Sequence, residues 1–214
     1  MNNNIKNHLN IRKNKDYEIL KQTAKIIKNG GIVVFPTETV YGIGTNGLDK
    51  VAIKKLYEIK KRPLEKPISL LVSNIKMIED LVEDITDIEY KLIKEFFPGP
   101  LTIILKKKNI VPDILTANKE TVGIRIPDND IALKLIEYAK TPIATTSANI
   151  SGNKSGTNIE DIKNGFKDKV DCYIDGGKSK LGIGSTIVQV VDGVPKILRE
   201  GSITKEQVYN CVNN

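Results

Sequence analysis

Two runs of polar side chains in this 214-residue sequence have the chemistry to bind an anionic substrate. The first is KKRPLEK, residues 60–66, which places Lys60 and Arg62 where a predicted helix ends. The second is TTSANISG, residues 145–152, which follows a predicted buried strand. Cations neutralise phosphate and carboxylate charge, and hydroxyl and amide groups bond such oxygens without adding charge. Each run also has an ordinary explanation, a solvated helix end for the first and a capped turn for the second.

Three further polar residues lie in or beside apolar strands. Arg125 occurs in VGIRIP, residues 122–127, where it must either face solvent or pair with an anion. Ser185 and Arg199 add a hydroxyl and a cation at opposite ends of a predicted C-terminal hairpin. These residues extend the predicted anion site beyond the two runs.

Histidine and cysteine are too few for several common kinds of catalytic site. The chain has one histidine, His8, and two cysteines, Cys172 and Cys211. These cannot assemble a zinc site or a Cys-His or Ser-His catalytic unit of the usual kinds. We therefore expect no metal ligands from protein side chains, and chemistry that uses Lys, Arg, Ser, Thr, Asn and carboxylates.

Composition and charge limit the class of protein. Lys and Arg number 33 against 26 Asp and Glu, a net charge of +7 that favours nucleotides or RNA as partners, although a lysine-rich surface needs no ligand. No apolar run approaches the ~20 residues needed to span a bilayer. Residues 1–15 are rich in Asn and Lys and lack the apolar core of a signal peptide. We expect a short N-terminal arm at 1–15, a single domain at 16–214, no membrane role and a cytoplasmic location.

Hydrophobic periodicity predicts alternating helices and strands. Helices are expected at residues 16–28, 49–62, 75–82, 87–97 and 130–139, and strands at 32–35, 68–72, 101–105, 122–126, 143–146 and 172–174. Asp192-Gly193 separates two further strands, 186–191 and 194–199, and is a strong hairpin signal. The fold class predicted is α/β, a twisted mixed sheet with flanking helices.

Residues 42–47, GIGTNG, match the dinucleotide-binding pattern G-x-G-x-x-G. That pattern must directly follow a strand and open a helix. Here residues 36–41 intervene after the strand, and the next helix begins only near Asp49. The context argues against a Rossmann site, although a nicotinamide-dependent oxidoreductase stays an alternative. The sequence also contains no G-x-x-x-x-G-K-[ST] phosphate loop.

Six ordered motifs together resemble one family. They are FPTETVYGIG, KKRPLEKPISLLV, FFPGPLTIIL, TVGIRIP, TTSANISG and STIVQV followed by ILREGSI, and they extend over about residues 16–203. In order and approximate spacing the chain resembles the YrdC-like threonylcarbamoyl-AMP synthases. The resemblance implies a basic cavity in the sheet. It also implies formation of threonylcarbamoyl-AMP and pyrophosphate from L-threonine, bicarbonate and ATP, with Mg²⁺ accompanying ATP.

The resemblance also implies roles for particular residues. Matching the family motifs position by position assigns catalysis, by contact with the ATP phosphates and the reacting carbamate, to Lys60, Arg62, Ser147 and Asn149. It also assigns further ATP contacts to Thr121, Ser155 and Arg199, and threonine binding to Thr37, Arg125, Thr145 and Ser185. Residues 36–44 should form one wall of the cavity. Some members have a histidine where this chain has Leu71, and we expect a short form without the extra C-terminal domain of long-form members.

The family's product implies a partner, and the net charge of this chain leaves one alternative function open. The family's adenylate is used to make N6-threonylcarbamoyladenosine at position 37 of tRNA, so tRNA or a downstream threonylcarbamoyl-transferase complex is an expected partner. The alternative is a module that binds structured RNA without catalysis, which would also explain the charge of +7.

Overall fold

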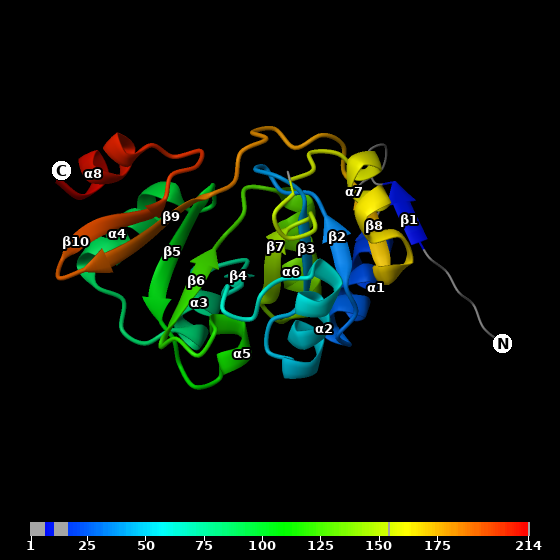
Figure 1. The fold of residues 1–214 in the computed structure, drawn as a ribbon. Coiled ribbons are helices and arrows are strands. Elements are labelled where there is room, and N and C mark those ends of the chain that lie inside the picture. Colours follow the sequence, from blue (N-terminus) through cyan, green and yellow to red (C-terminus); the bar gives the residue numbers. More distant parts are fainter. Residues whose placement is uncertain (1–6, 11–16, 154, 214) are drawn as a thin grey trace.

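The computed structural model describes residues 7–10, 17–153 and 155–213, and these residues build one mixed β-sheet (Figure 1). Its strands are β1 (Asn7–Asn10), β2 (Val33–Phe35), β3 (Gly42–Asn46), β4 (Ser69–Leu71), β5 (Leu101–Lys106), β6 (Thr121–Arg125), β7 (Ile143–Ser147), β8 (Cys172–Asp175), β9 (Thr186–Val191) and β10 (Val194–Arg199). Their order across the sheet is β1-β8-β2-β3-β7-β4-β6-β5-β9-β10. Parallel and antiparallel pairs both occur, so the predicted mixed α/β class is confirmed.

Helices cover both faces of this sheet. They are α1 (Tyr17–Lys28), α2 (Lys50–Lys60), α3 (Ile75–Leu81), α4 (Asp87–Phe96), α5 (Asp113–Thr116), α6 (Asp130–Ala139), α7 (Ile159–Phe166) and α8 (Lys205–Asn213), with a short 3₁₀ turn at Lys167–Lys169. The apolar residues of α1 and α6 pack with Val33 and Phe35, whereas those of the other helices pack with Ile32 and Val34. Alternate residues of one strand thus face two cores, as the pleat of a β-strand requires.

Local sequence explains where the helix that precedes the basic run begins and ends. The Asp49 carboxylate caps the N-terminus of α2 by accepting from the backbone N–H groups of Val51 and Ala52. At the other end Lys61 adopts a left-handed conformation with φ of 50°, and the Arg62 N–H donates to the Tyr57 carbonyl at 2.9 Å. This closing motif turns the chain sharply, so Arg62 leaves the helix in a fixed direction.

The structure differs from the sequence-based expectations at several elements. Gly42–Asn46 form β3, which pairs with β2 and β7 and was not among the predicted strands. Asn7–Asn10, assigned to the N-terminal arm, pair in parallel with β8 as an edge strand. Helices α5, α7 and α8 were not predicted. Residues 1–6 and 11–16, which include the rest of the expected arm and the predicted first residue of α1, lie outside the described residues.

A long connection joins two distant parts of the sheet. After β8 the chain crosses above the central strands to reach β9 (Figure 1). Backbone N–H groups of this connection donate to the segment between β2 and β3: Leu181 to the Glu38 carbonyl at 2.9 Å, and Gly182 to the Thr39 carbonyl at 2.8 Å. The crossing segment therefore forms a roof over the residues that follow β2.

Candidate active site

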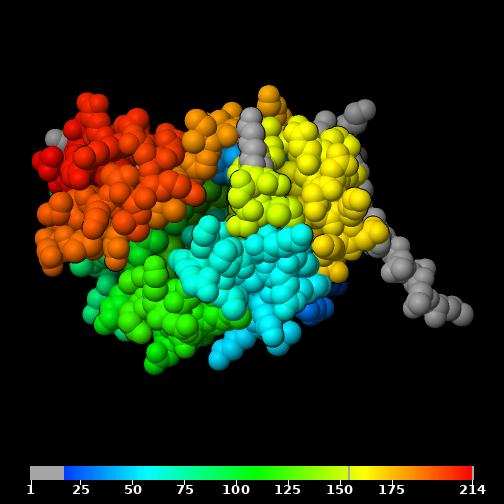
Figure 2. Space-filling model, viewed as in Figure 1, coloured from blue at the N-terminus to red at the C-terminus, as the bar shows by residue number. Residues whose placement is uncertain are grey.

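Two adjoining cavities lie beneath this roof. The smaller, of about 220 Å³, is lined by residues from β3, β4, β6, β7 and β9 and from the segment between β2 and β3. The larger, of about 750 Å³, lies between α7, the end of β7 and the roof, and shares Val40, Ser155 and Gly184 with the smaller. Figure 2 shows the surface hollowed between the orange C-terminal strands, the cyan segment of α2 and the yellow-green segment after β7. A volume of roughly 300–1,000 Å³ is typical of small-molecule sites.

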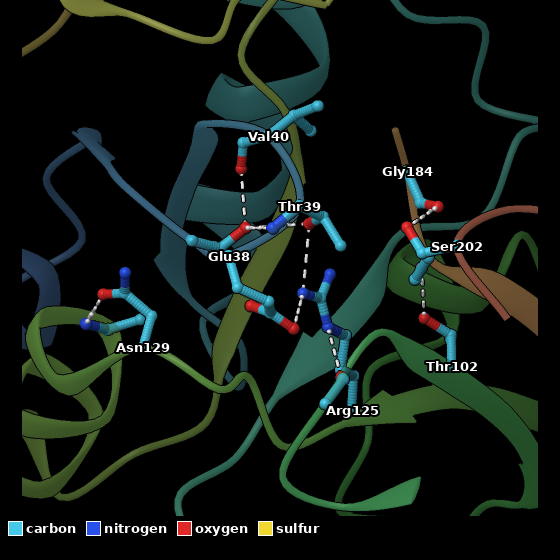
Figure 3. A network of polar contacts seen from close by, with 12 residues as sticks. Glu38, Thr39, Val40, Thr102, Arg125, Asn129, Gly184 and Ser202 are labelled. Atoms are coloured by element: carbon cyan, nitrogen blue, oxygen red, sulfur yellow. Dashed lines mark hydrogen bonds and ion pairs between the residues drawn. The ribbon is translucent and has the colours of Figure 1, made fainter. Parts of the chain in front are cut away.

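Arg125, the last residue of β6, is fixed at one side of the smaller cavity. Its Nε donates to the Gly99 carbonyl at 3.1 Å, and its Nη2 donates to Thr39 Oγ1 at 3.0 Å. The same Nη2 forms an ion pair with Glu38 Oε1 at 2.5 Å. Figure 3 shows Glu38 and Thr39 on one side of this guanidinium. Among the described residues Nη1 has no hydrogen-bond partner, so it is the part left to bind a ligand.

Hydroxyl groups continue this network away from Arg125. The Thr37 hydroxyl donates to the Val40 carbonyl at 2.6 Å and lies 2.9 Å from Thr39 Oγ1. A threonine hydroxyl has one proton, so Thr39 must donate to Thr37 while accepting from Arg125. These hydrogen bonds, each with a defined donor, hold residues 36–39 in place as one wall of the cavity.

Lys60 is buried behind the end of β7 and is only 1% exposed. Its Nζ donates to the Asn149 carbonyl at 2.6 Å and also to the Ser147 carbonyl. Burial, with a smaller contribution from the charge of Arg62, lowers the pKa of Lys60 to about 7. Lys60 thus holds the backbone of the TTSANISG run in place.

The side chains of that run are hydrogen-bonded to one another and to nearby carbonyls. Ser147 Oγ donates to Asn149 Oδ1 at 2.5 Å, and Asn149 Nδ2 donates to the Asn153 carbonyl at 2.6 Å. Ser147 lines the smaller cavity, whereas Asn149 lines the larger one. The run therefore forms the boundary between the two cavities.

Two more arginines face the smaller cavity. Arg62 donates from Nε to the Lys66 carbonyl at 3.0 Å and from Nη2 to the Pro67 carbonyl at 2.8 Å. Arg199 donates to the Ser185 carbonyl and hydroxyl, and that hydroxyl lies 2.8 Å from Thr102 Oγ1. Burial lowers the pKa of Arg199, and the charges of Arg125 and Arg62 lower it further. The cavity is therefore strongly electropositive.

The structure brings together most of the residues selected from the sequence. Eight of the eleven line the smaller cavity: Thr37, Arg62, Arg125, Thr145, Ser147, Ser155, Ser185 and Arg199. Asn149 lines the larger cavity, and Lys60 lies behind the wall. Thr121 begins β6, opposite Lys106, and lines neither cavity. Leu71 lines the smaller cavity at the position where some family members have histidine.

Four Ser and Thr residues that line the smaller cavity were not among the site residues assigned from the sequence: Thr39, which lies within the wall expected at residues 36–44, Ser69, Thr102 and Thr146. Thr39 and Thr102 are 1% and 3% exposed, and both line the smaller cavity. Thr102 is a threonine within the apolar strand LTIIL, so its position inside a buried strand was the available signal.

The described residues contain neither a metal-binding cluster of side chains nor a membrane-spanning helix. No group of three or more His, Cys, Asp or Glu side chains is placed to hold a metal ion among them. In that part of the chain no helix is both long and apolar enough to cross a bilayer.

Comparison with known proteins gives consistent matches. The model of the Sua5/YciO/YrdC family, described as "Telomere recombination", matches residues 25–201. Threonylcarbamoyl-AMP synthase of Pyrococcus abyssi is 39% identical over 204 residues, covering 95% of this chain and 60% of the relative. A putative threonylcarbamoyl-AMP synthase of Methanocaldococcus jannaschii is 42% identical over 194 residues, covering 91% of each chain.

Solved structures agree with these matches. P. abyssi Sua5 complexed with L-threonine superposes with a TM-score of 0.93 at 38% identity, covering 95% of this chain and 60% of that one. E. coli YciO has a TM-score of 0.83 at 28% identity, covering 94% and 97%. The chain spans 60% of the length of the P. abyssi relative and 55% of a Bacillus subtilis relative. On the family model and these relatives, the chain belongs to the Sua5/YciO/YrdC family.

Proposed function

We propose that this chain is an L-threonylcarbamoyladenylate synthase, which forms threonylcarbamoyl-AMP and pyrophosphate from L-threonine, bicarbonate and ATP. The observation that carries the proposal is the convergence of Arg62, Arg125 and Arg199 with hydroxyl side chains on one cavity that opens into a second. ATP and the threonine carboxylate repel each other unless fixed cations lie between them. The names of the relatives, and the threonine bound to P. abyssi Sua5, support the choice of substrate.

The two cavities suggest a division of roles. Threonine fits the smaller cavity, with its carboxylate on Arg125 Nη1 and its hydroxyl among Thr37, Thr145 and Ser185. ATP fits the larger cavity, with its phosphates reaching Arg62, Arg199 and the Ser147–Asn149 boundary. The threonine amine attacks the bicarbonate carbon, and a C–O bond breaks as the hydroxyl leaves with an amine proton as water, which gives the carbamate. A carbamate oxygen then attacks the α-phosphorus, and the bond from that phosphorus to the bridging oxygen breaks as pyrophosphate leaves. Positioning and charge stabilisation supply the catalysis, without a covalent enzyme intermediate.

Mg²⁺ belongs to this proposal as a companion of ATP. The polar groups lining the cavities are mainly hydroxyls, amides and cations, and the described residues offer no cluster of carboxylates for a metal. Mg²⁺ is commonly held by substrate phosphates and water with few protein ligands. The ion would neutralise charge on the departing pyrophosphate.

The product points to the next reaction. A carbamoyl adenylate is a mixed anhydride that must be consumed by group transfer. We propose that tRNA, through a downstream threonylcarbamoyl-transferase complex, receives the threonylcarbamoyl group for the N6-threonylcarbamoyl modification of adenosine 37. A cytoplasmic location is part of this proposal.

The test is turnover by the pure protein with ATP, Mg²⁺, bicarbonate and radiolabelled amino acids. We expect pyrophosphate release and a labelled adenylate with threonine, and little of either with valine. Valine leaves polar groups unpaired in a site built for a hydroxyl. Equal turnover of the two amino acids would contradict the assigned threonine site. Salt-dependent RNA binding without pyrophosphate release would favour the RNA-binding alternative.

A further inference from the structure

Glu38 forms a buried ion pair that the proposed reaction does not use directly. Its side chain is 4% exposed and that of Arg125 is 8% exposed. Oε1 lies 2.5 Å from Arg125 Nη2 as an ion pair, and neither carboxylate oxygen has a hydrogen-bond partner among the described residues. Glu38 does not line either cavity, and Figure 3 shows its carboxylate beside the Arg125 guanidinium.

Stability alone is a poor explanation for this arrangement. Removing two charges from water is costly, and a buried pair offsets that cost only when its remaining lone pairs are also bonded. Glu38 does not meet that condition, because neither of its carboxylate oxygens has a hydrogen-bond partner among the described residues. A pair of apolar side chains of similar volume would stabilise the fold at least as well. We therefore look for the role of the ion pair in its effect on Arg125.

The contacts of Arg125 indicate what that effect is. Gly99 and Thr39 hold Nε and Nη2 by hydrogen bonds to neutral oxygens, whereas Glu38 supplies the one charged contact. Two opposite charges in a buried site attract each other more strongly than a cation attracts a neutral oxygen. With Nε and Nη2 both engaged, the guanidinium cannot rotate to present its Nε–Nη2 edge, and Nη1 is the nitrogen to which no described residue is hydrogen-bonded.

We propose that Glu38 is a positioning residue for threonine recognition: it fixes the Arg125 guanidinium so that Nη1 is presented to the substrate carboxylate. This inference rests on the proposed function, because it names how the same site selects its amino-acid substrate. It assigns Glu38 no contact with threonine or ATP. The effect of Glu38 must therefore pass through Arg125.

The test compares Glu38→Gln with the wild-type protein in the pyrophosphate-release assay. Glutamine keeps the shape of the side chain but removes the charge that holds Nη2. We expect the KM for threonine to rise roughly tenfold, with the KM for ATP and kcat nearly unchanged. A role in folding alone would lower the amount of active enzyme and leave both KM values as they were. Glu38→Asp keeps the charge but withdraws it by one methylene, and should raise the KM for threonine as well.

A double mutant of Glu38 and Arg125 tests the positioning role more directly. In an Arg125→Lys background, Glu38→Gln should add little to the KM for threonine, because the group that Glu38 positions is already gone. Glu89→Gln is a matched control, since Glu89 is also buried but caps α4, bonded to Thr86. That variant should leave both KM values unchanged.

The outcomes separate this inference from the proposed function. Absence of threonine-dependent pyrophosphate release by the wild-type protein would overturn the proposed function and this inference with it. Normal wild-type turnover, with an unchanged KM for threonine in both Glu38 variants, would overturn the positioning role alone. Fully additive effects of Glu38→Gln and Arg125→Lys would do the same.

Discussion

Lys60 shows how burial can change the role that a sequence motif suggests. In sequence it is the first cation of a basic run, and a contact with phosphate or carbamate was expected. In the structure its Nζ donates to two backbone carbonyls, those of Ser147 and Asn149. A direct ligand contact stays a prediction, whereas the hold on the TTSANISG backbone is present without a ligand. Sequence could not distinguish these roles, because the burial of Lys60 depends on the packing of α7 and β7.

The lowered pKa of Lys60 makes stability depend on pH. Its folded pKa is about 7, against 10.5 for the free side chain, so between these values the unfolded chain binds more protons than the folded one. The contribution of Lys60 to the free energy of unfolding is therefore least below pH 7 and rises as the pH increases towards 10. The slope is at most about 1.4 kcal/mol per pH unit.

Urea unfolding of the wild-type protein and Lys60→Met at pH 7 and pH 9 checks this prediction. The difference in free energy of unfolding should shift in favour of the wild type at pH 9. A difference that does not change with pH would mean that the two carbonyls keep Lys60 protonated throughout this range.

At the scale of elements, the end of α2 sets the direction of Arg62. Lys61 is exposed and holds φ of 50°, a conformation that costs a residue with a side chain about 1–2 kcal/mol relative to glycine. Lys61→Gly should therefore raise the free energy of unfolding by about 1 kcal/mol and the Tm by about 2–4 °C, with kcat/KM unchanged. Thermal unfolding and the turnover assay measure the two effects, with Lys61→Ala as the control that should gain no stability. A large loss of turnover in Lys61→Gly would place the Lys61 side chain in the site.

Strand β3 is an element that the sequence patterns did not predict. Its residues GIGTN carry two glycines, which are usually unfavourable in strands, and they follow a polar segment. The structure supplies the reason: a Cβ at Gly44 would lie 2.7 Å from the Ala144 carbonyl oxygen on β7. A single sequence does not reveal which two strands will pack so closely that one of them needs glycine. By contrast α2 and α6, and the strands β9 and β10 on either side of Asp192-Gly193, were predictable because caps, turn residues and hydrophobic periodicity are local signals.

Two substitutions in β3 should have opposite effects. Gly44→Ala introduces a clash with β7 and should lower the free energy of unfolding by about 1–3 kcal/mol. Thr45 is fully buried, and its hydroxyl has no hydrogen-bond partner among the described residues. Thr45→Val removes that unsatisfied group and should be neutral or stabilising. Urea unfolding measures both, and a destabilisation by Thr45→Val as large as that by Gly44→Ala would contradict this account of the strand.

At the scale of the whole molecule, the site combines segments that are far apart in sequence. Arg62 follows α2, Arg125 ends β6, and Arg199 ends β10, yet all three line one cavity. Their side chains could be selected from the sequence because charged residues beside apolar strands are unusual. The distances between these side chains, and the ion pair between Arg125 and Glu38, could not be predicted because they depend on the packing of segments that are far apart in the sequence.

Burial lowers the pKa of Arg199 most, and the charges of Arg125 and Arg62 lower it further, so repulsion among these arginines adds to the electrostatic cost of the cavity. An anionic ligand relieves this repulsion, so ligands should raise the Tm. At 100 times its Kd a ligand adds about 2.7 kcal/mol to the free energy of unfolding, or about 5–10 °C for a chain of this size. We expect ATP with Mg²⁺ and threonine each to raise the Tm, and both together to raise it further.

Variants can assign these two shifts to separate arginines of the smaller cavity. Arg125→Lys should remove most of the threonine shift and keep the ATP shift, because lysine supplies charge without the fixed geometry of the guanidinium. Arg62→Ala should reduce the ATP shift and spare that of threonine, because Arg62 leaves α2 on the side where the phosphates are proposed to lie. Differential scanning fluorimetry across a ligand titration gives both shifts, with Lys61→Ala as the control that should match the wild type. Loss of both shifts in either variant, with the protein still folded, would mean that the two ligands share one subsite and would contradict the proposed division of the cavity.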